Sequence, residues 1–257
     1  MNSFNIAAIN AFKDNYIWAL VHSTTKTALV VDPGEAQPVI DFLEARHLSL
    51  QAILITHHHA DHRGGIPILA KKYSPVIYGP QHADINPTVI IDTVTHLDIP
   101  LFGKFNVVRI PGHTLEHTAY YHETGLLFSG DTLFSAGCGR VFEGTYEQMY
   151  HSLLKLSSFP DDTKIYCGHE YTLANLAFAQ AVEPCNPDIQ QMMIECEKKR
   201  HINVPTLPST LLTEKKVNPF LRCDIATVVA SAEKQTGQIL KTPIDVFREL
   251  RLWKNNF

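Results

Sequence analysis

The sequence predicts an α+β protein with two mixed sheets, helices on the outside of those sheets, and a smaller helical region at the end. Two observations predict this fold. Through the first two thirds of the 257 residues, short apolar runs alternate with helical patterns. Some of these runs follow each other directly, without a helical pattern between them. After about residue 172 the strand signal stops and helical patterns follow one another. The length is enough for one large core or two modest ones.

Seven segments have the short, β-branched or aromatic composition of strands and are mostly bounded by Gly, Pro or Asp. They are residues 28–32, 52–56, 75–79, 105–110, 118–122, 126–130 and 164–168. Helical patterns cover residues 37–47, 65–73, 146–156, 172–183, 186–201, 224–237 and 242–257. Asn186 is a plausible helix start and Gly237 a plausible stop. The segment 202–220 contains three prolines and is predicted to be a loop.

Charge and cysteine usage exclude several classes of protein. Residues 1–189 hold 11 Lys/Arg and 19 Asp/Glu, a net of −8, whereas residues 190–257 hold 11 and 7, a net of +4. The overall charge of −4 gives no support to nucleic-acid binding. Five cysteines without a C-x-x-C pair argue against a disulfide framework. The N-terminus resembles no leader and no run reaches about 18 apolar residues, so we expect a cytoplasmic protein without a membrane partner. A monomer is a separate expectation.

Histidine and aspartate follow four of the predicted strands. The run from His57 to His62 comes after residues 52–56, and His113 comes after residues 105–110. Asp131 follows residues 126–130, and His169 follows residues 164–168. Loops at one edge of a sheet can converge, so these side chains are candidates for one site.

The spacing within the first cluster favours metal binding. Residues i and i+2 of an extended segment point the same way, so His57 and His59 can share one ion while His58 points elsewhere. Imidazole and carboxylate suit Zn²⁺, Fe and Mn. Two ions roughly 3.5–4 Å apart need an anionic bridge. The predicted ligands are His57, His59 and His113 for one ion, Asp61, His62 and His169 for the other, and Asp131 as the bridge.

A single histidine in a loop is more often a surface or hydrogen-bonding residue than a ligand. For His58 we prefer that interpretation, and for Cys138 and Cys167 we expect small packed side chains. The whole H-x-H-x-D-H set with its partners is hard to explain in the same way, because several ligand types would have to follow apolar strands by accident.

Several motifs resemble those of a known family. "THHHADH", "PGHT", "GDTLF" and "GHEY" are similar to motifs of the metallo-β-lactamase superfamily. "GCGRVFEGT", "NPFLR" and the ending "FRELRLWKNNF" extend the match over essentially the whole chain. The combination resembles the glyoxalase II, or hydroxyacylglutathione hydrolase, family. This resemblance implies a four-layer αββα sandwich over residues 1–171 and a helical glutathione-binding domain over residues 172–257.

The resemblance also implies an activity and its residues. The expected reaction is hydrolysis of S-D-lactoylglutathione to glutathione and D-lactate by a metal-bound hydroxide, the second step of methylglyoxal detoxification. Asp61 and Asp131 would be the catalytic carboxylates beside two divalent ions, with zinc expected and iron or manganese as alternatives. The implied glutathione contacts are Arg140, Phe142, Tyr171, Arg251 and Lys254. Some members have Lys and Tyr where this chain has Arg140 and Phe142, which puts a hydroxyl contact at residue 142 in doubt.

Three other functions compete with this hypothesis. An iron-dependent persulfide dioxygenase has the same fold but would keep one ion, and the basic helical ending favours the hydrolase. A nuclease would need a basic surface, which the charge of −8 over residues 1–189 does not supply. A metal-bound scaffold would leave open coordination positions and a basic tail without a use.

Overall fold

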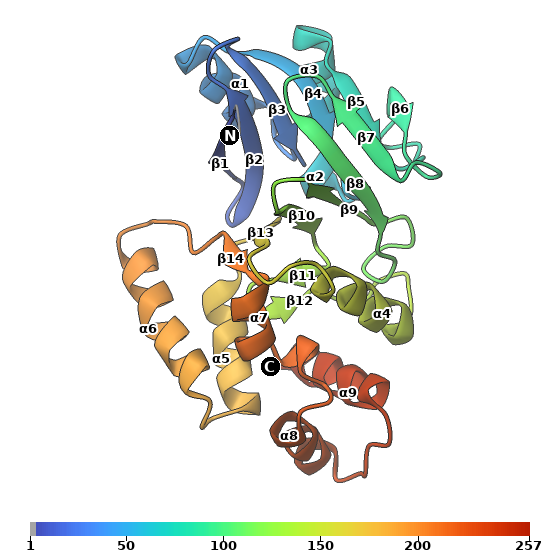
Figure 1. Ribbon diagram of the computed structural model, residues 1–257, viewed down its shortest axis with the longest axis vertical. Coiled ribbons are helices and arrows are strands. Elements are labelled where there is room, and N and C mark those ends of the chain that lie inside the picture. Colours follow the sequence, from blue (N-terminus) through green and yellow to red (C-terminus); the bar gives the residue numbers. More distant parts are fainter. Residues whose placement is uncertain (1–3) are drawn as a thin grey trace. The chain divides into compact units, whose positions relative to one another are not determined.

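The computed structural model describes residues 4–257, whose elements follow the colours of Figure 1 from blue to red. These residues divide into two compact units, each of which packs mainly against itself. The first contains residues 4–109 and 116–130, and the second contains residues 110–115 and 131–257. Residues 131–171 therefore pack with the C-terminal helices, and the boundary after residue 171 stays a prediction.

The first unit contains a sheet with the strand order β1-β2-β3-β4-β5-β6. The first three strands are antiparallel and the later ones are added in parallel. The strands are β1 (Asn5–Ala11), β2 (Asn15–His22), β3 (Thr27–Val31), β4 (Ser49–Leu54), β5 (Val76–Gly79) and β6 (Val89–Ile90). The parallel arrangement brings the ends of β3 and β4 to the same edge, which is where the first candidate ligands begin.

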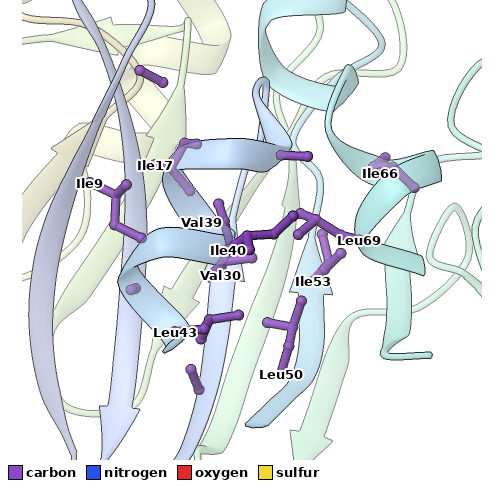
Figure 2. Close-up of a cluster of buried hydrophobic side chains, with 14 of the residues drawn as sticks. Ile9, Ile17, Val30, Val39, Ile40, Leu43, Leu50, Ile53, Ile66 and Leu69 are labelled. Atoms are coloured by element: carbon purple, nitrogen blue, oxygen red, sulfur yellow. The ribbon is translucent and has the colours of Figure 1, made fainter. Parts of the chain in front are cut away.

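Two helices cover one face of this sheet, as Figure 2 shows. Val39 and Leu43 of α1 (Ala36–Ala45) and Leu69 of α3 (Ile66–Tyr73) are fully buried against strand residues such as Val30 and Ile53. Each such side chain stabilises the fold by about 1.5–3 kcal/mol relative to an exposed position. The helices thereby hold the β4 strand rigid behind the site.

Four further antiparallel strands of the first unit are ordered β10-β9-β8-β7. They are β7 (His96–Ile99), β8 (Gly103–Arg109), β9 (Thr118–His122) and β10 (Leu126–Gly130). Tyr120 of β9 is completely buried, and its hydroxyl donates to the carbonyl of Ile55 at 2.7 Å. This bond ties the second group of strands to the segment immediately after β4.

The second unit is mainly helical. Its strands are β11 (Leu133–Phe134) paired with β12 (Gly137–Cys138), and β13 (Lys164–Cys167) paired with β14 (Ser209–Thr210). Its helices are α4 (Tyr146–Ser157), α5 (Thr172–Val182), α6 (Pro187–His201), α7 (Leu211–Val217), η1 (Pro219–Leu221), α8 (Ala226–Thr236) and α9 (Pro243–Asn255). The Asn186 side chain caps α6, and Gly237 ends α8 at φ 69°, as predicted.

All seven predicted strands and all seven predicted helices are present in the described residues. The predicted loop at 202–220 was wrong in part, because it contains β14, α7 and η1. Its prolines lie outside α7, and the Thr210 side chain caps that helix by accepting a hydrogen bond from the Thr213 amide at 3.2 Å. Strands β1, β2, β6, β7, β11 and β12 were not predicted. β6, β11 and β12 have two residues each, which is too short for a periodic signal, and β2 is apolar without alternation.

Within residues 4–257, none of the helices combines the length and the hydropathy that a bilayer-spanning segment requires.

Candidate metal centre and substrate pocket

The candidate ligands of the first unit follow β4 directly. The chain runs without regular structure from the end of β4 to the short helix α2 (Ala60–Arg63), and this stretch carries His57 and His59. Asp61 and His62 lie in α2 itself. His57 is fully buried, and its ring centroid lies 4.2 Å from that of His62 and 4.7 Å from that of His59. The local chain therefore gathers the imidazoles that the sequence placed in one cluster.

Asp32, at the end of β3, organises this cluster. Its carboxylate accepts hydrogen bonds from the Thr56 amide at 2.8 Å and from the Thr56 hydroxyl at 2.7 Å. Its Oδ2 atom also lies 3.0 Å from Nδ1 of His62. Asp32 has a φ of 52°, the left-handed region that few residues other than glycine adopt. A carboxylate on the far nitrogen of a histidine is the usual way of fixing the orientation of a metal ligand.

His62 and Asp61 then face each other through atoms that both accept hydrogen bonds. Because Asp32 can only accept, Nδ1 of His62 carries the proton and Nε2 presents its lone pair. That Nε2 atom lies 3.5 Å from Oδ2 of Asp61. The same oxygen accepts a hydrogen bond from the Asn15 side chain at 3.0 Å, which orients the carboxylate.

In the second unit a carboxylate also faces histidine nitrogens. It belongs to Asp131, the residue after β10. Its Oδ2 atom lies 3.2 Å from Nε2 of His169 and 3.6 Å from Nε2 of His113. All three residues are buried. A Cβ atom at Gly139 would lie 1.9 Å from the Asp131 carbonyl oxygen, so only glycine allows the chain to pass this close.

The hydrogen bond between His113 and a main-chain carbonyl fixes which ring nitrogen of His113 carries the proton. Nδ1 lies 2.8 Å from the carbonyl oxygen of Arg140, which can only accept. Nε2 of His113 therefore directs a lone pair toward the Asp131 carboxylate. Two acceptors that face each other are stabilised by a cation between them, and imidazole with carboxylate is a donor set suited to a divalent transition metal. The residues in each unit therefore fit metal ions.

His58 behaves differently from its neighbours, as its position in the run predicts. Its Nδ1 atom lies 2.6 Å from Glu116, and its amide donates to the same carboxylate oxygen at 3.0 Å. Its ring stacks on His82 with the centroids 4.2 Å apart. These contacts give His58 a structural role within the first unit.

A cavity of about 490 Å³ lies in the second unit, with His113 and Asp131 in its wall. The five residues that the family resemblance assigns to glutathione all line this cavity: Arg140, Phe142, Tyr171, Arg251 and Lys254. Phe142 is 62% exposed, and its ring meets His113 edge-on at 5.2 Å. Tyr171 stacks in parallel on His169 at 4.6 Å. Aromatic side chains thus connect the cavity to His113 and His169, the two candidate ligand histidines of the second unit.

The two cations of α9 that line the cavity are held by main-chain carbonyls. Arg251 is 3% exposed, and its Nη1 group donates to the Cys138 carbonyl at 2.7 Å. Lys254 donates to the Ala174 carbonyl at 2.9 Å. Burial and the neighbouring Arg251 lower the pKa of Lys254 to about 8. Arg248, which precedes Arg251 by three residues on α9, is exposed beside Glu249 and is not among the residues that line the cavity.

Asp32 and Asn15 were not among the predicted site residues, although a predicted strand ends at Asp32. The available signal was an aspartate at a strand end, the same signal that selected Asp131. Cys138 and Cys167 are buried, and burial raises the pKa of the Cys138 thiol. A thiol that resists ionisation is a poor metal ligand, which agrees with the packed role expected for it.

Comparisons with known proteins cover the whole length of the chain. Residues 14–169 match the model of the metallo-beta-lactamase superfamily, and residues 170–257 match that of the hydroxyacylglutathione hydrolase C-terminus. Hydroxyacylglutathione hydrolase of Nitrosomonas eutropha is 48% identical over 98% of this chain and 99% of its own. That of Aeromonas salmonicida is 49% identical over 99% of this chain and 100% of its own.

Solved structures with the same fold are more distant. ETHE1 from Myxococcus xanthus has a TM-score of 0.64 at 21% identity and covers 98% of this chain and 97% of its own. TTHA1623, solved in a di-iron-bound form, has a TM-score of 0.51 at 25% identity, covering 63% of this chain and 91% of its own.

Proposed function

Because the chain belongs to the hydroxyacylglutathione hydrolase family of the metallo-β-lactamase superfamily, we propose that it hydrolyses S-D-lactoylglutathione to glutathione and D-lactate at two divalent metal ions. The C-terminal family match is decisive for the substrate class, since the superfamily motifs alone identify only the fold. One structural observation supports the proposal most strongly. The cavity that holds the predicted glutathione contacts has the candidate metal ligands His113 and Asp131 in its own wall.

The proposed ligand set comes from both units. His57, His59 and His113 would hold one ion, Asp61, His62 and His169 the other, and Asp131 would contact both. The acceptor pairs support this assignment, because His62 faces Asp61 and His113 faces Asp131 in the same manner. When bound, divalent ions supply a nucleophile at neutral pH by lowering the pKa of water toward roughly 7, and they polarise a carbonyl. Zinc suits this donor set, and iron or manganese are the alternatives.

The side chains of the cavity explain how the glutathione moiety would be held. Glutathione carries two carboxylates, and Arg140, Arg251 and Lys254 present three cations to the cavity. Charge-assisted hydrogen bonds of this kind contribute roughly 1.5–3 kcal/mol each. Phe142 and Tyr171 offer apolar faces next to the two histidines. This arrangement would direct the thioester toward Asp131 while the carboxylates stay near α9.

The reaction places modest demands on the protein. The acyl carbon gains a bond to a water oxygen and loses its bond to sulfur, and the thiolate leaves with the electron pair. A thiolate is a good leaving group, so no strong general acid is required. Asp61, oriented by Asn15 at 3.0 Å, is the proposed acceptor of the water proton. Asp131 would keep both ions in place.

The rival functions lose support for separate reasons. The curated relatives that match the full chain bear the hydrolase name. The net charge of −8 over residues 1–189 disfavours a nuclease, since nucleic-acid backbones require basic surfaces. A scaffold would have no use for a cavity that three cations line next to candidate metal ligands. We further propose a cytoplasmic monomer without nucleic-acid or membrane partners.

An assay of thiol release on S-D-lactoylglutathione, with metal analysis of the same sample, tests the proposed function. We expect turnover with two metal ions per chain, loss of turnover after chelation, and recovery when Zn²⁺ is returned. Thiol release that survives complete removal of metal would contradict the proposal. So would a fully metal-loaded protein that releases no thiol.

The pKa of Lys254 predicts a pH dependence of substrate capture. The amine is charged below about pH 8 and neutral above it, because burial, Arg251 and Arg140 oppose the charge more than Cys138 favours it. We therefore expect kcat/KM, which reports the unbound enzyme, to fall as pH rises through about 8.

Two controls isolate the contribution of Lys254. The arginine of Lys254→Arg stays charged at every pH of the assay, so this variant should not show the fall in kcat/KM above about pH 8, the alkaline limb of the pH profile. A thioester without the glutathione carboxylates should show no limb of this origin in the wild-type protein. An identical alkaline limb for the variant and for both substrates would assign the ionisation to another group.

A further inference from the structure

The tip of the β11–β12 hairpin is buried inside the second unit, although it is a turn. Ser135 and Ala136 form this tip and are 1% and 0% exposed. Ala136 has a φ of 54°, a left-handed conformation that alanine adopts rarely. A buried turn leaves main-chain groups that need partners away from water. The surrounding side chains must therefore both satisfy the tip and fix its shape.

Glu214 of α7 binds the tip most directly. It is completely buried, and its Oε2 atom accepts a hydrogen bond from the Ala136 amide at 2.7 Å. Its Oε1 atom accepts hydrogen bonds from the hydroxyls of Ser135, at 3.1 Å, and Ser209. Burial raises the pKa of Glu214, so the environment opposes its charge even though four donors surround the carboxylate.

Two buried amides complete the contacts. Asn218 donates to the carbonyls of Phe134 at 3.2 Å and Gly137 at 2.9 Å, and also to Glu214 at 3.2 Å. Asn175 of α5 donates to the Ser135 carbonyl at 3.0 Å. Side chains from α5, α7 and the start of η1 thus form hydrogen bonds to both strands of the hairpin and to its tip. Asn218 begins the "NPFLR" motif, which the proposed chemistry leaves without a role.

The hairpin leads directly into the substrate cavity. Phe134 and Cys138, one on each strand, line that cavity together with Asn175. The Phe134 ring meets His169 at 5.9 Å and Tyr171 at 5.4 Å, both edge-on. The Cys138 carbonyl is the acceptor for Arg251. A shift of the hairpin would therefore move an aromatic wall and the partner of a buried cation at once.

We propose that Glu214 is a positioning residue for substrate binding, which acts with Asn218 by holding the β11–β12 hairpin in the shape that forms the cavity wall. This inference rests on the proposed function of the cavity. Glu214 acts through hydrogen-bond geometry. Glutamine has the same shape, and the serine hydroxyls can reverse their role from donor to acceptor, so Glu214→Gln should preserve the hairpin.

Binding of S-methylglutathione, a thioether that cannot be hydrolysed, tests this role at equal metal occupancy. We expect Glu214→Ala to raise the Kd about tenfold, equivalent to roughly 1.4 kcal/mol, and KM for the thioester to rise with it. Asn218→Ser should have the same effect. Serine can still cap η1 at the Phe220 amide but cannot reach the carbonyls of Phe134 and Gly137. This second variant tests the hairpin if Glu214→Ala does not fold.

Leu211→Ala is the matched control, because Leu211 is fully buried in the same helix and its apolar side chain cannot hydrogen-bond to the hairpin, so its truncation should lower stability without removing such a bond. The inference predicts a lowered Tm with an unchanged Kd for Leu211→Ala, and a Kd close to wild type for Glu214→Gln. Wild-type affinity in both Glu214→Ala and Asn218→Ser would overturn it, as would equal losses in the Gln and Ala variants. Failure of the wild-type protein to bind S-methylglutathione would instead contradict the proposed function.

Discussion

Replacing Asp131 by alanine is expected to remove one or both of the two proposed metal ions and to lower turnover more than about 100-fold. Even residues that only orient metal ligands typically contribute 10- to 100-fold to affinity or activity. Asp131 has a larger role in the proposed site, since its Oδ2 atom lies 3.2 Å from His169 and 3.6 Å from His113. Without it, the proposed ions would lose the one carboxylate that lies beside both His113 and His169.

Two further variants separate this effect from general damage. Asp131→Asn preserves the volume of the side chain but removes its charge, so it should lose metal almost as completely. His58→Ala is the control within the histidine cluster, because His58 is bound to Glu116 and stacked on His82. It should keep the metal content of the wild-type protein, whereas His59→Ala should reduce it. Near-normal kcat and two ions in Asp131→Ala would refute the bridging assignment.

Most elements of the fold could be predicted from the sequence, because most strands are short apolar runs bounded by Gly, Pro or polar residues. The predicted metallo-β-lactamase fold with its helical C-terminal region is confirmed by the family matches and the related structures. Several of the strands that were not predicted are too short for a periodic signal, such as β11 and β12 with two residues each. Helix α7 was hidden between prolines, although Thr210 supplied a normal start signal.

The candidate site was predictable to the extent that its residues are chemically conspicuous. Histidines after strands can be found by inspection, and all five expected glutathione contacts line one cavity. The sequence does not distinguish Asp32 from other aspartates at strand ends as a partner of a metal ligand. Its role depends on a 3.0 Å contact with His62, which lies 30 residues away in the sequence. Glu214 likewise has an ordinary helical context. Its contact with Ala136 joins segments 78 residues apart and exists only in the folded chain.

Arg251 has contacts that stabilise the fold and a proposed role in substrate binding, and the two can be separated. Its Nη1 group is bound to the Cys138 carbonyl, its Nε group donates to Asn255 at 3.1 Å, and its guanidinium lies 5.1 Å from the centre of the Phe220 ring. These contacts do not use the Nη2 group, and the side chain lines the substrate cavity. A cation near the end of a helix also interacts favourably with the helix dipole, typically by about 0.3–1 kcal/mol. The dipole alone would affect stability and leave substrate selectivity unchanged.

Arg251→Ala is therefore expected to raise KM for S-D-lactoylglutathione by roughly ten- to a hundredfold, as the loss of one charge-assisted contact predicts. The variant should also unfold at a lower temperature, because the buried Cys138 carbonyl loses its donor. Metal content should stay unchanged, since Arg251 contacts none of the proposed ligands in these bonds. The decisive comparison uses a thioester that lacks the glutathione carboxylates. Its KM should change much less, because that substrate has no anion for Arg251 to bind. If both substrates lose the same factor, Arg251 supports the cavity only through the fold, and the selectivity for glutathione must come from Arg140 and Lys254.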